Sequence, residues 1–594
     1  MINQEIAKIF RNFAFYFEMQ DIAFKPQAYR KAADAIEALS QYLEEIYKSG
    51  GIKFLEEISG IGKSMAEKIE EYIKTGKIKE YRELKKKIPV EIAELIAVEG
   101  VGPKAVRDLY EHLKIKNLKD LEKAAKAGKI RELPRFGVKS EQKILEGIAF
   151  LKKSGSRFLL GEILPKVKAI KNALKNLKEV KKVEVCGSIR RRKETIGDVD
   201  FLVSIKKISQ PAVAKAMAGK VMDFFVSLPG VVKIWGKGAT KTSIRTKDGF
   251  DMDIRVVPKK SFGAALQYFT GSKEHNIILR KIAIEKGLKL NEYGLFNGLK
   301  MIAGEIEEEI YEKLGAQWIS PEMRENQGEI ELSLKGKLPE LIELKDIKGD
   351  LHCHSHWGAG NGKEGIENLI KMAIEMGYEY IGISDHTKFL RIEHGLDEKQ
   401  LMEQKKEIDK LNHKLKIENC KLKILRGCEA NIMADGSIDI KDEALEKLDY
   451  VIAGVHSQMN MPKEKMTERI IKAMRNPNVD IISHPTGRIL KQRDEYEMDF
   501  EKILEVAKET KIILEINANP YRLDLNDKNI RKAKKAGVKM IINSDAHQKN
   551  QMGFMEYGVF QARRGWAEKK DIINCRPVDE LLLSMKPCLT VGRS

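Results

Sequence analysis

The sequence predicts a chain of several domains: a helical N-terminal region, a mixed α/β region, and a C-terminal barrel of alternating strands and helices. Three observations predict this order. The length of 594 residues exceeds what one hydrophobic core usually organises. Apolar residues recur at helical spacing up to residue 150, and β-rich runs separated by helical segments begin at Val183. Beyond residue 347, short apolar runs alternate with longer helical patterns, as repeated βα units do.

Composition and charge indicate a folded, cytoplasmic protein with no membrane partner. No run of 18 or more apolar residues is present, and the first residues lack the pattern of a signal peptide. The six cysteines include no Cys-X-X-Cys pair, which argues against a disulfide framework or a thiolate zinc site. The formal net charge of +19 divides into +23 for residues 1–300 and −4 for residues 301–594. The first half is therefore expected to meet a polyanion, and a lysine-rich surface of a heat-adapted protein is the alternative.

Two segments of the helical region share a hydrophobic-Gly-X-Gly pattern, with Gly60 and Gly62 in one and Gly100 and Gly102 in the other. Glycine permits positive φ and close approach of backbone N–H groups to a phosphate, and the following helix adds the positive end of its dipole. One such turn alone is better explained as a connection between packed helices. Two copies, the second followed by Lys104, favour DNA-backbone binding and resemble helix-hairpin-helix motifs.

The first hairpin region also resembles the small lyase domain of polymerase beta, on residues 28–33 and 66–69. The resemblance implies that Lys68 forms a Schiff base with a 5′-deoxyribose phosphate, with Lys25 and Tyr29 in supporting positions. An amine can do this only if its pKa is lowered, by desolvation or by neighbouring cations. Ser64 stands where the family has another lysine, so the resemblance leaves lyase activity open.

The middle region carries an Asp-X-Asp pair, Asp198 and Asp200, on a predicted strand. Residues two apart on a strand face the same side, so both carboxylates can hold hard divalent cations, and Asp253 on another predicted strand supplies a third. Two Mg²⁺ or Mn²⁺ ions at such a site can activate a 3′-hydroxyl and stabilise a leaving pyrophosphate. Asp-X-Asp alone is a weak signal, because it is commonly a solvated strand end.

The Asp-X-Asp pair follows a Gly-Ser turn, Gly187-Ser188, and an arginine cluster that includes Arg191. The turn would contact nucleotide phosphates, and Arg191 would add positive charge. This combination resembles the palm of the nucleotidyltransferase superfamily, to which polymerase beta belongs.

A second match lies downstream and resembles the nucleotide-selecting end of family X DNA polymerases. It contains Tyr268, Phe269, Gly271, Ser272, Asn276 and Arg280. The resemblance implies that Tyr268 and Phe269 pack against the sugar and discriminate against a 2′-hydroxyl. It also implies that Asn276 reads the minor-groove edge of the base pair and that Arg280 touches the template side. In isolation the two aromatic residues would be read as ordinary core residues.

In the C-terminal region, metal-competent side chains follow successive apolar runs. They are His352, His354, His386, Glu429, His456, His484, Asp545 and His547. The carboxyl ends of parallel strands in a barrel meet on one face, so these side chains are expected to converge. Histidine with carboxylate suits Mn²⁺, Zn²⁺ or Fe²⁺.

Residues 347–570 resemble the polymerase and histidinol phosphatase (PHP) domain, a distorted βα barrel that binds up to three metals. In polymerase fusions this domain is associated with 3′–5′ exonuclease, abasic-site endonuclease and 3′-end processing. The family's Asp-Gly after His-X-His-Ser is absent here. Either Asn361 or His356 would substitute for the aspartate, or one metal binds weakly or not at all.

These resemblances divide the chain into seven expected parts. They are 1–90, lyase-like; 91–150, helix-hairpin-helix; 151–260, palm; 261–320, nucleotide-selecting; 321–346, linker; 347–575, PHP; and 576–594, tail. The linker rests on an acidic, irregular stretch from Glu305 to Glu331.

The expected function is that of a monomeric, template-directed repair polymerase that fills gaps in gapped or nicked duplex DNA from deoxynucleoside triphosphates, fused to a nuclease. The alternatives are a DNA-end-binding scaffold with inactive sites, and a template-independent nucleotidyltransferase with a small-molecule phosphatase.

Overall fold

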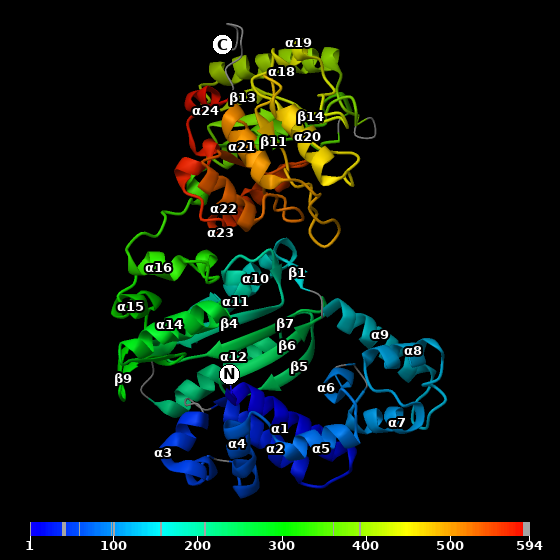
Figure 1. Ribbon diagram of the computed structural model, residues 1–594, viewed down its shortest axis with the longest axis vertical. Helices are drawn as coiled ribbons and strands as arrows, with labels where there is room; N and C mark the ends of the chain where they lie inside the picture. The colour runs from blue at the N-terminus through cyan, green and yellow to red at the C-terminus, as the bar shows by residue number, and fades with distance from the viewer. Residues whose placement is uncertain are drawn as a thin grey trace. The chain divides into compact units, whose positions relative to one another are not determined.

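The computed structural model describes residues 2–38, 43–58, 60–96, 98, 101–154, 157–206, 210–359, 361–390 and 394–585. These residues form two compact units (Figure 1). The first contains Met1–Ser156 with Thr246–Phe250, and the second contains Arg157–Arg245 with Asp251–Ser594.

The N-terminal part of the first unit is helical, as predicted. Its helices are α1 (Ile2–Met19), α2 (Lys25–Ala38), α3 (Leu43–Glu56), α4 (Lys63–Thr75), α5 (Lys79–Lys87), α6 (Ile92–Leu95), α7 (Pro103–Leu113), α8 (Leu118–Lys126) and α9 (Val138–Ser154). Two apolar cores hold them together, one among α1–α4 and one among α6–α9. Helix α1 joins the cores, because Phe13 lies in the first and Tyr16 in the second.

The second unit begins with a five-stranded sheet in the order β2-β4-β7-β6-β5 (Figure 1). The strands are β2 (Val180–Val185), β4 (Asp198–Ile205), β5 (Val231–Lys237), β6 (Lys241–Thr246) and β7 (Asp251–Val256). Strands β4 and β7 run parallel, with Asp200 paired to Asp253. Helices α10 (Leu160–Lys175) and α12 (Pro211–Val226) pack on the sheet. A short pair, β1 (Phe158–Leu159) and β3 (Thr195–Ile196), and the helical turn α11 (Gly187–Arg190) complete this region.

A smaller subdomain follows the sheet. It contains α13 (Phe262–Thr270), α14 (Lys273–Glu285), the antiparallel strands β8 (Lys289–Asn291), β9 (Gly294–Asn297) and β10 (Lys300–Ala303), α15 (Glu307–Lys313) and α16 (Glu329–Leu334). Its core includes Ile310, Tyr311 and Leu314, and Met323 and Ile330 belong to the same core.

The stretch expected to be a linker is therefore largely packed. Glu307 and Glu329, which in the sequence belong to an acidic irregular run, are both almost fully buried. Residues 321–346 contain α16, and two of their apolar side chains join the preceding core. Sequence pattern failed here because two of the partners of these glutamates, Arg190 and His275, lie far from them in the sequence, and the third, Arg324, meets Glu307 only once the stretch is folded.

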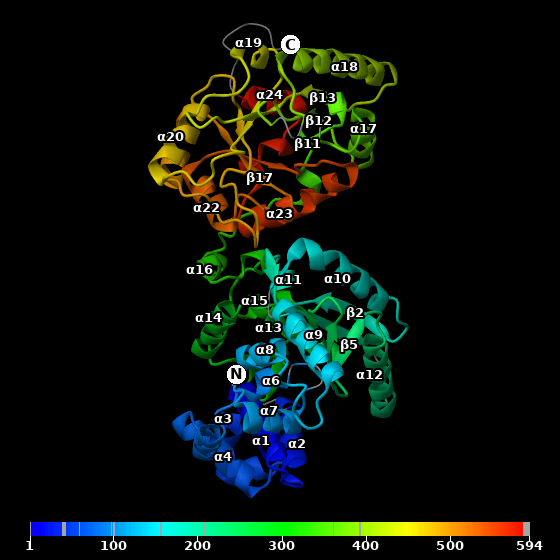
Figure 2. The ribbon, with the colours of Figure 1, turned by 90° about the vertical axis from the view of Figure 1, so that its right-hand side faces the viewer.

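The C-terminal part of the second unit is a barrel of parallel strands with helices outside (Figure 2). Its strands are β11 (Gly349–Cys353), β12 (Tyr380–Ile383), β13 (Lys423–Arg426), β14 (Glu429–Asn431), β15 (Ile452–Gly454), β16 (Ile481–Ile482), β17 (Ile513–Asn517) and β18 (Met540–Asn543). They form the sheets β11-β12-β13 and β14-β15-β16-β17-β18, and bridges His386–Glu429 and Cys353–Ala546 connect the two sheets. The predicted barrel of βα units is confirmed.

The barrel helices are α17 (Ile366–Glu375), α18 (Glu398–Ile417), α19 (Asp442–Leu445), α20 (Lys463–Met474), α21 (Phe500–Thr510), α22 (Asp527–Ala536), α23 (Met555–Arg564) and α24 (Val578–Ser584). The apolar faces of α17–α23 and the outward side chains of the strands form the largest core among the described residues, whereas α24 packs on a second core that includes inward side chains of the strands. In the described ranges, no helix has both the length and the apolar character that crossing a bilayer requires.

Candidate functional site

The parallel pairing of β4 and β7 brings the three predicted carboxylates of the sheet together. Asp200 lies opposite Asp253, and Asp198 shares the face of Asp200. Burial, followed by the negative charges of Asp198 and Asp253, raises the pKa of Asp200 to about 7. Burial and the charge of Asp253 likewise raise the pKa of Asp198. Negative charge gathered so closely that it raises the pKa of Asp198 and Asp200 fits a site for divalent cations, whose charge offsets the repulsion.

The turn before β4 faces these carboxylates. Gly187 opens α11 with φ +66°, and a Cβ there would lie 3.3 Å from Oδ2 of Asp200. It would also lie 4.0 Å from the carbonyl oxygen of Phe269. A side chain at position 187 would thus crowd the carboxylate, and glycine leaves this space open for a ligand. Ser188 follows in the same turn and is half-buried.

Arg191 connects this turn with the α13–α14 junction. Its Nη1 donates to the carbonyl of Thr270, and its Nε lies 3.1 Å from Oε1 of Glu325. Gly271 has φ +66°, and a Cβ there would lie 3.2 Å from Arg191 Nη1. Ser272 caps α14 by accepting a hydrogen bond from the backbone N–H of residue 275. The structure therefore brings the predicted phosphate-contacting and nucleotide-selecting segments together.

The remaining nucleotide-selecting residues lie on α13 and α14. Tyr268 and Phe269 are half-buried and meet edge to face, with ring centroids 5.1 Å apart. Asn276 donates from Nδ2 to the carbonyl of Tyr268 at 2.7 Å and accepts from Gln267 at 2.7 Å. Arg280 donates from Nε to the carbonyl of Asn276 at 3.2 Å. The Asn276 amide is thus engaged within the protein, and its reading of a base edge stays a prediction.

Sequence reasoning missed a buried ionic network behind this site. Arg190 makes two hydrogen bonds of 2.9 Å to Glu307, and Arg324 Nη1 lies 2.6 Å from the same carboxylate. Burial raises the pKa of Glu307, but the charges of Arg324 and Arg190 outweigh it and the net pKa is lowered. Arg190 also donates to Thr270 Oγ1 at 2.7 Å. Only its place in the arginine cluster could have hinted at this role.

The glycines of the two hairpins differ in conformation. Gly60 has φ +90°, whereas Gly62 and Gly102 are extended and precede α4 and α7 as their N-caps. A Cβ at Gly62 or Gly102 would meet nothing within 4 Å, so both helix starts are open on that side. Gly100 lies outside the described residues.

The predicted basic residues of the first unit have partners. The Lys25 ammonium lies 5.1 Å from the ring centroid of Phe17. Lys104 forms an exposed ion pair of 2.9 Å with Asp21. Contact of either lysine with DNA stays a prediction.

Lys68 is mostly buried and its amine is paired. Its Nζ lies 2.9 Å from Oε2 of Glu80 and donates to Oγ of Ser64 at 2.9 Å. Burial lowers its pKa, but Glu80 and Tyr29 outweigh burial and the net pKa is raised. This direction is opposite to the one a Schiff-base lysine needs.

The eight predicted ligands of the barrel converge, as the strand-end argument predicted. Three overlapping groups could each hold an ion: His352, His354 and Asp545; His354, His386 and His547; and His386, Glu429 and His456. Glu429 is central, since its oxygens lie 3.2 Å from His352 Nε2 and 3.0 Å from His386 Nδ1. They also lie 3.2 Å from His456 Nε2 and 3.0 Å from His484 Nε2.

The donor set fits divalent metals. Within the described part of the chain, His352 Nε2, both ring nitrogens of His354 and His386 Nδ1 are buried and make no hydrogen bond of suitable geometry, although Glu429 lies within 3.2 Å of His352 Nε2 and His386 Nδ1. Buried polar atoms are nearly always satisfied, so ring nitrogens that converge unsatisfied on carboxylates fit cation binding. Imidazole with carboxylate suits Mn²⁺, Zn²⁺ or Fe²⁺.

Several residues that orient the ligands escaped the sequence reasoning. Glu515 Oε1 lies 2.7 Å from His352 Nδ1 and can accept its proton in a hydrogen bond, and Asn431 Oδ1 likewise accepts from His456 Nδ1 at 2.7 Å. Such partners fix the ring orientation and leave the other nitrogen for a metal. Glu515 lies on β17 between apolar residues, and this position within a buried strand was the available signal.

His356 does not take the place of the aspartate in the missing Asp-Gly element. Its side chain is exposed, its Nδ1 contacts the carbonyl of Gly362 at 3.1 Å, and it joins none of the three groups. Asn361 is half-buried in the same loop, and its substitution for the aspartate stays a prediction.

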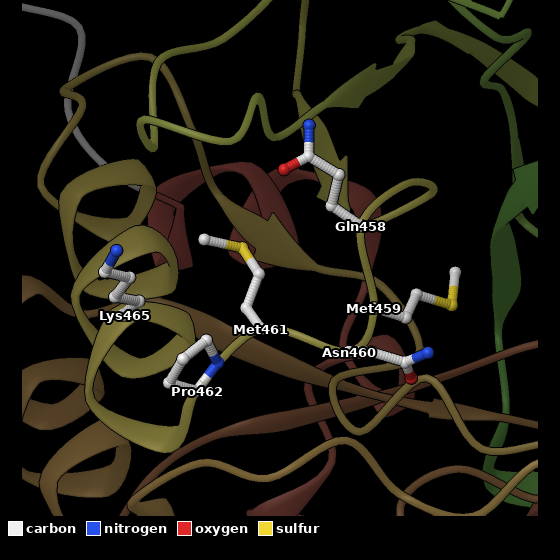
Figure 3. Close-up of a pocket in the computed structure, with 6 residues that line it drawn as sticks. All are labelled: Gln458, Met459, Asn460, Met461, Pro462 and Lys465. Carbon is white, nitrogen blue, oxygen red and sulfur yellow. The ribbon is translucent and has the colours of Figure 1, made fainter.

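A pocket of about 520 Å³ opens two residues beyond His456 (Figure 3). It is lined by Gln458, Met459, Asn460, Met461, Pro462 and Lys465. The buried Arg469 supports its loop by donating to the carbonyl of Ser457 at 2.9 Å. Amide groups, thioethers and one cation thus adjoin the segment after β15, which carries the metal-competent His456.

Five family models match the chain. They are a helix-hairpin-helix domain (1–78), a SAM-like helix-hairpin-helix tandem (92–149), the DNA polymerase beta palm (161–228), the DNA polymerase beta thumb (265–325) and the PHP domain (350–519).

Relatives and one solved structure match over different shares of the chain. The DNA polymerase/3′–5′ exonuclease PolX of Bacillus subtilis is 36% identical over 99% of this chain and 100% of its own length. A probable phosphatase of Caldicellulosiruptor saccharolyticus is 31% identical over 34% of this chain and 81% of its own. A ternary complex of Leishmania infantum polymerase beta is 25% identical over 39% of this chain and 97% of its own, with a TM-score of 0.30.

Proposed function

The chain belongs to the family of the DNA polymerase/3′–5′ exonuclease PolX, and on that premise we propose how its two sites divide the work. The carboxylates of the five-stranded sheet extend a DNA primer, and the histidine-rich barrel removes nucleotides from a 3′ end. The observation that carries the polymerase assignment is the convergence of Asp198, Asp200 and Asp253 on the face next to Gly187.

At the polymerase site, Asp198, Asp200 and Asp253 would hold two Mg²⁺ or Mn²⁺ ions. When bound, these ions supply charge that lowers the pKa of a 3′-hydroxyl and offsets negative charge on the leaving pyrophosphate. Gly187 leaves room for a phosphate beside the carboxylates. Arg191, supported by the carbonyl of Thr270, would bind the triphosphate by charge-assisted hydrogen bonds.

The base and sugar of the incoming nucleotide would meet α13 and α14. Tyr268 and Phe269 would pack on the sugar and exclude a 2′-hydroxyl, and Asn276 and Arg280 would contact the base pair and the template. Gly271 and Ser272 would line the same nucleotide, since Gly271 adjoins Arg191 and Ser272 follows it at the start of α14.

At the barrel, the eight residues named above would hold up to three Mn²⁺, Zn²⁺ or Fe²⁺ ions. Bound ions there supply a Lewis acid for a phosphodiester and an activated water. Glu515 and Asn431 orient His352 and His456. Half-buried Met459 and Met461 offer apolar surface to a base next to His456, which favours a DNA end over a small phosphomonoester. Abasic-site cleavage and 3′-end processing are further reactions we expect of this centre.

We expect the substrate to be gapped or nicked duplex DNA, with the chain acting as a monomer in base excision repair. The +23 charge of residues 1–300 and the open helix starts at Gly62 and Gly102 support contact with the phosphate backbone. A scaffold with inactive sites, and a template-independent transferase with a small-molecule phosphatase, are the competing functions.

One assay on a labelled gapped duplex separates these functions. With Mg²⁺ or Mn²⁺ and nucleotides the primer should grow according to the template, and without nucleotides it should shorten from its 3′ end. Asp253→Asn should reduce extension about 10³-fold or more, because a metal ligand contributes several kcal/mol to the transition state. The same variant should still shorten the primer. Full extension by Asp253→Asn would exclude the polymerase site, and extension without a template would favour the transferase.

A further inference from the structure

A barrel residue holds the turn that carries Arg191. This turn, residues 191–194, runs from α11 to β3 and is named here the arginine turn. Arg564, the last residue of α23, donates from Nη1 to the carbonyl of Arg191 at 2.8 Å. The same Nη1 lies 3.2 Å from Oε1 of Glu325, the oxygen that Arg191 Nε contacts at 3.1 Å. Arg564 is only 4% exposed, and its Nη2 pairs with Asp527 at 2.5 Å.

The far end of the arginine turn is held by other barrel residues. Glu194 accepts from Arg488 at 2.5 Å and from Gln561 Nε2 at 2.8 Å. Between the two ends, the guanidinium of Arg192 lies 4.1 Å from the ring centroid of Phe560. Every one of these contacts lies within the second unit. The arginine turn is therefore fixed at its first, second and last residues by the barrel.

Arg191 is held at both its side chain and its main chain before a nucleotide binds. The side chain is anchored at Thr270, and the main chain is anchored by Arg564. A cation fixed before its ligand arrives loses less conformational freedom on binding. Arg564 also shares the negative charge of Glu325 with Arg191, so Glu325 neutralises Arg191 less completely.

We infer that Arg564, a residue of the exonuclease barrel, is a positioning residue for nucleotide binding at the polymerase site. The inference rests on the proposed role of Arg191 as a triphosphate ligand. Loss of Arg564 should thus weaken nucleotide binding while the barrel continues to shorten DNA.

Arg563 provides a matched control on the same helix. It donates from Nε to Glu322 at 2.9 Å and from Nη1 to the carbonyl of Ile342 at 2.9 Å. In the described structure it makes no hydrogen bond to Arg191, and its charge acts on the arginine turn only at Arg192. Arg563→Ala and Arg564→Ala thus remove the same side chain at adjacent positions of α23, and each removes a pairing with a glutamate of residues 322–325. Only the second releases Arg191.

The test measures KM for a nucleotide, kcat for extension, and shortening of a primer without nucleotides, all in the full chain. We expect Arg564→Ala to raise KM about tenfold, as loss of a hydrogen bond made by a charged group does, with a smaller change in kcat. Arg564→Lys, which keeps the charge and one donor, should lie between Arg564→Ala and the parent. Arg563→Ala should leave KM within about twofold of the parent.

Equal KM values for Arg564→Ala and Arg563→Ala would overturn the inference. If Arg564→Ala also loses shortening activity, the variant has misfolded. The KM values of Arg564→Gln and Arg564→Lys are then compared with that of Arg563→Ala in its place. Arg191→Ala separates the two levels of the proposal. An unchanged KM in Arg191→Ala would remove the proposed role of Arg191, whereas a raised KM there with an unchanged KM in the Arg564 variants would remove only the positioning role.

Discussion

At the scale of single residues, the surroundings of an amine decide what it can do. Lys68 is the residue that resemblance assigns to Schiff-base chemistry, yet its Nζ is paired with Glu80 at 2.9 Å. The pair outweighs burial and raises the Lys68 pKa. Because only the neutral amine attacks a carbonyl carbon, the parent chain should be a slow lyase near neutral pH.

Glu80→Gln should make Lys68 a better nucleophile. The substitution removes the charge that raises the Lys68 pKa and leaves the burial that lowers it. Each unit by which the pKa falls increases the neutral fraction about tenfold at a pH well below the pKa. Borohydride trapping of a 5′-deoxyribose phosphate end measures this, with the rate expected to rise in Glu80→Gln and to vanish in Lys68→Ala. A trapping rate in Glu80→Gln no higher than in the parent would show that Lys68 is not the nucleophile that Glu80 restrains.

Residue roles differed in how far the sequence could predict them. Metal-competent side chains such as Asp200 and Glu429 stand in motifs or at strand ends, where spacing alone predicts that they converge. The residues that hydrogen-bond to these ligands could not be predicted from spacing. Glu515, for example, contacts His352 from 163 positions away in the sequence. Arg190 and Glu307 are similarly far apart. Such pairs exist only once the elements are packed.

At the scale of elements, α15 shows how a local pattern can mislead. Its first turn is Glu307-Glu308-Glu309, which reads as a solvated acidic stretch. One of the three points inward, since Glu307 is 2% exposed and meets two arginines and Trp318. Strands with two buried faces and helices with one apolar stripe were predictable, because their buried positions are occupied by apolar residues that the sequence shows directly. The charged residues of a buried ion pair cannot be told from exposed charged residues by sequence pattern.

Glu307→Gln should destabilise the second unit strongly. It leaves the fully buried Arg324 and the largely buried Arg190 without their shared carboxylate, and breaking a buried ion pair costs about 3–5 kcal/mol. Glu308→Gln is the matched control, because Glu308 is exposed one position along the same helix and its loss should cost under about 0.5 kcal/mol. Calorimetry of the full chain measures the midpoint of the transition that includes this unit. Similar midpoints for the two variants would contradict the importance assigned to the network.

At the scale of the whole molecule, two compact units differ in what stabilises them. The N-terminal helices of the first unit pack around apolar cores, and its described residues contribute to none of the three metal-competent groups. The second unit contains Glu429 and seven further buried or half-buried candidate ligands near it. Without a cation, these side chains carry unsatisfied ring nitrogens in the barrel. Metal binding and stability should therefore be coupled in one unit and independent in the other.

Removing metal should lower the unfolding midpoint of the second unit alone. An ion that binds only the folded state stabilises it by about 2.7 kcal/mol at a free concentration 100 times its Kd, and a chelator reverses this. In a calorimetric scan of chelated protein, adding Mn²⁺ should raise the barrel transition in proportion to the logarithm of ion concentration and leave the helical unit unchanged. Glu429→Gln should flatten that response, because it removes the carboxylate that lies within 3.2 Å of four histidines. Mn²⁺ could instead raise the unfolding midpoints of both units equally, or raise those of the parent and Glu429→Gln by the same amount. Either result would show that the ion acts on the protein surface and not at the candidate ligands around Glu429.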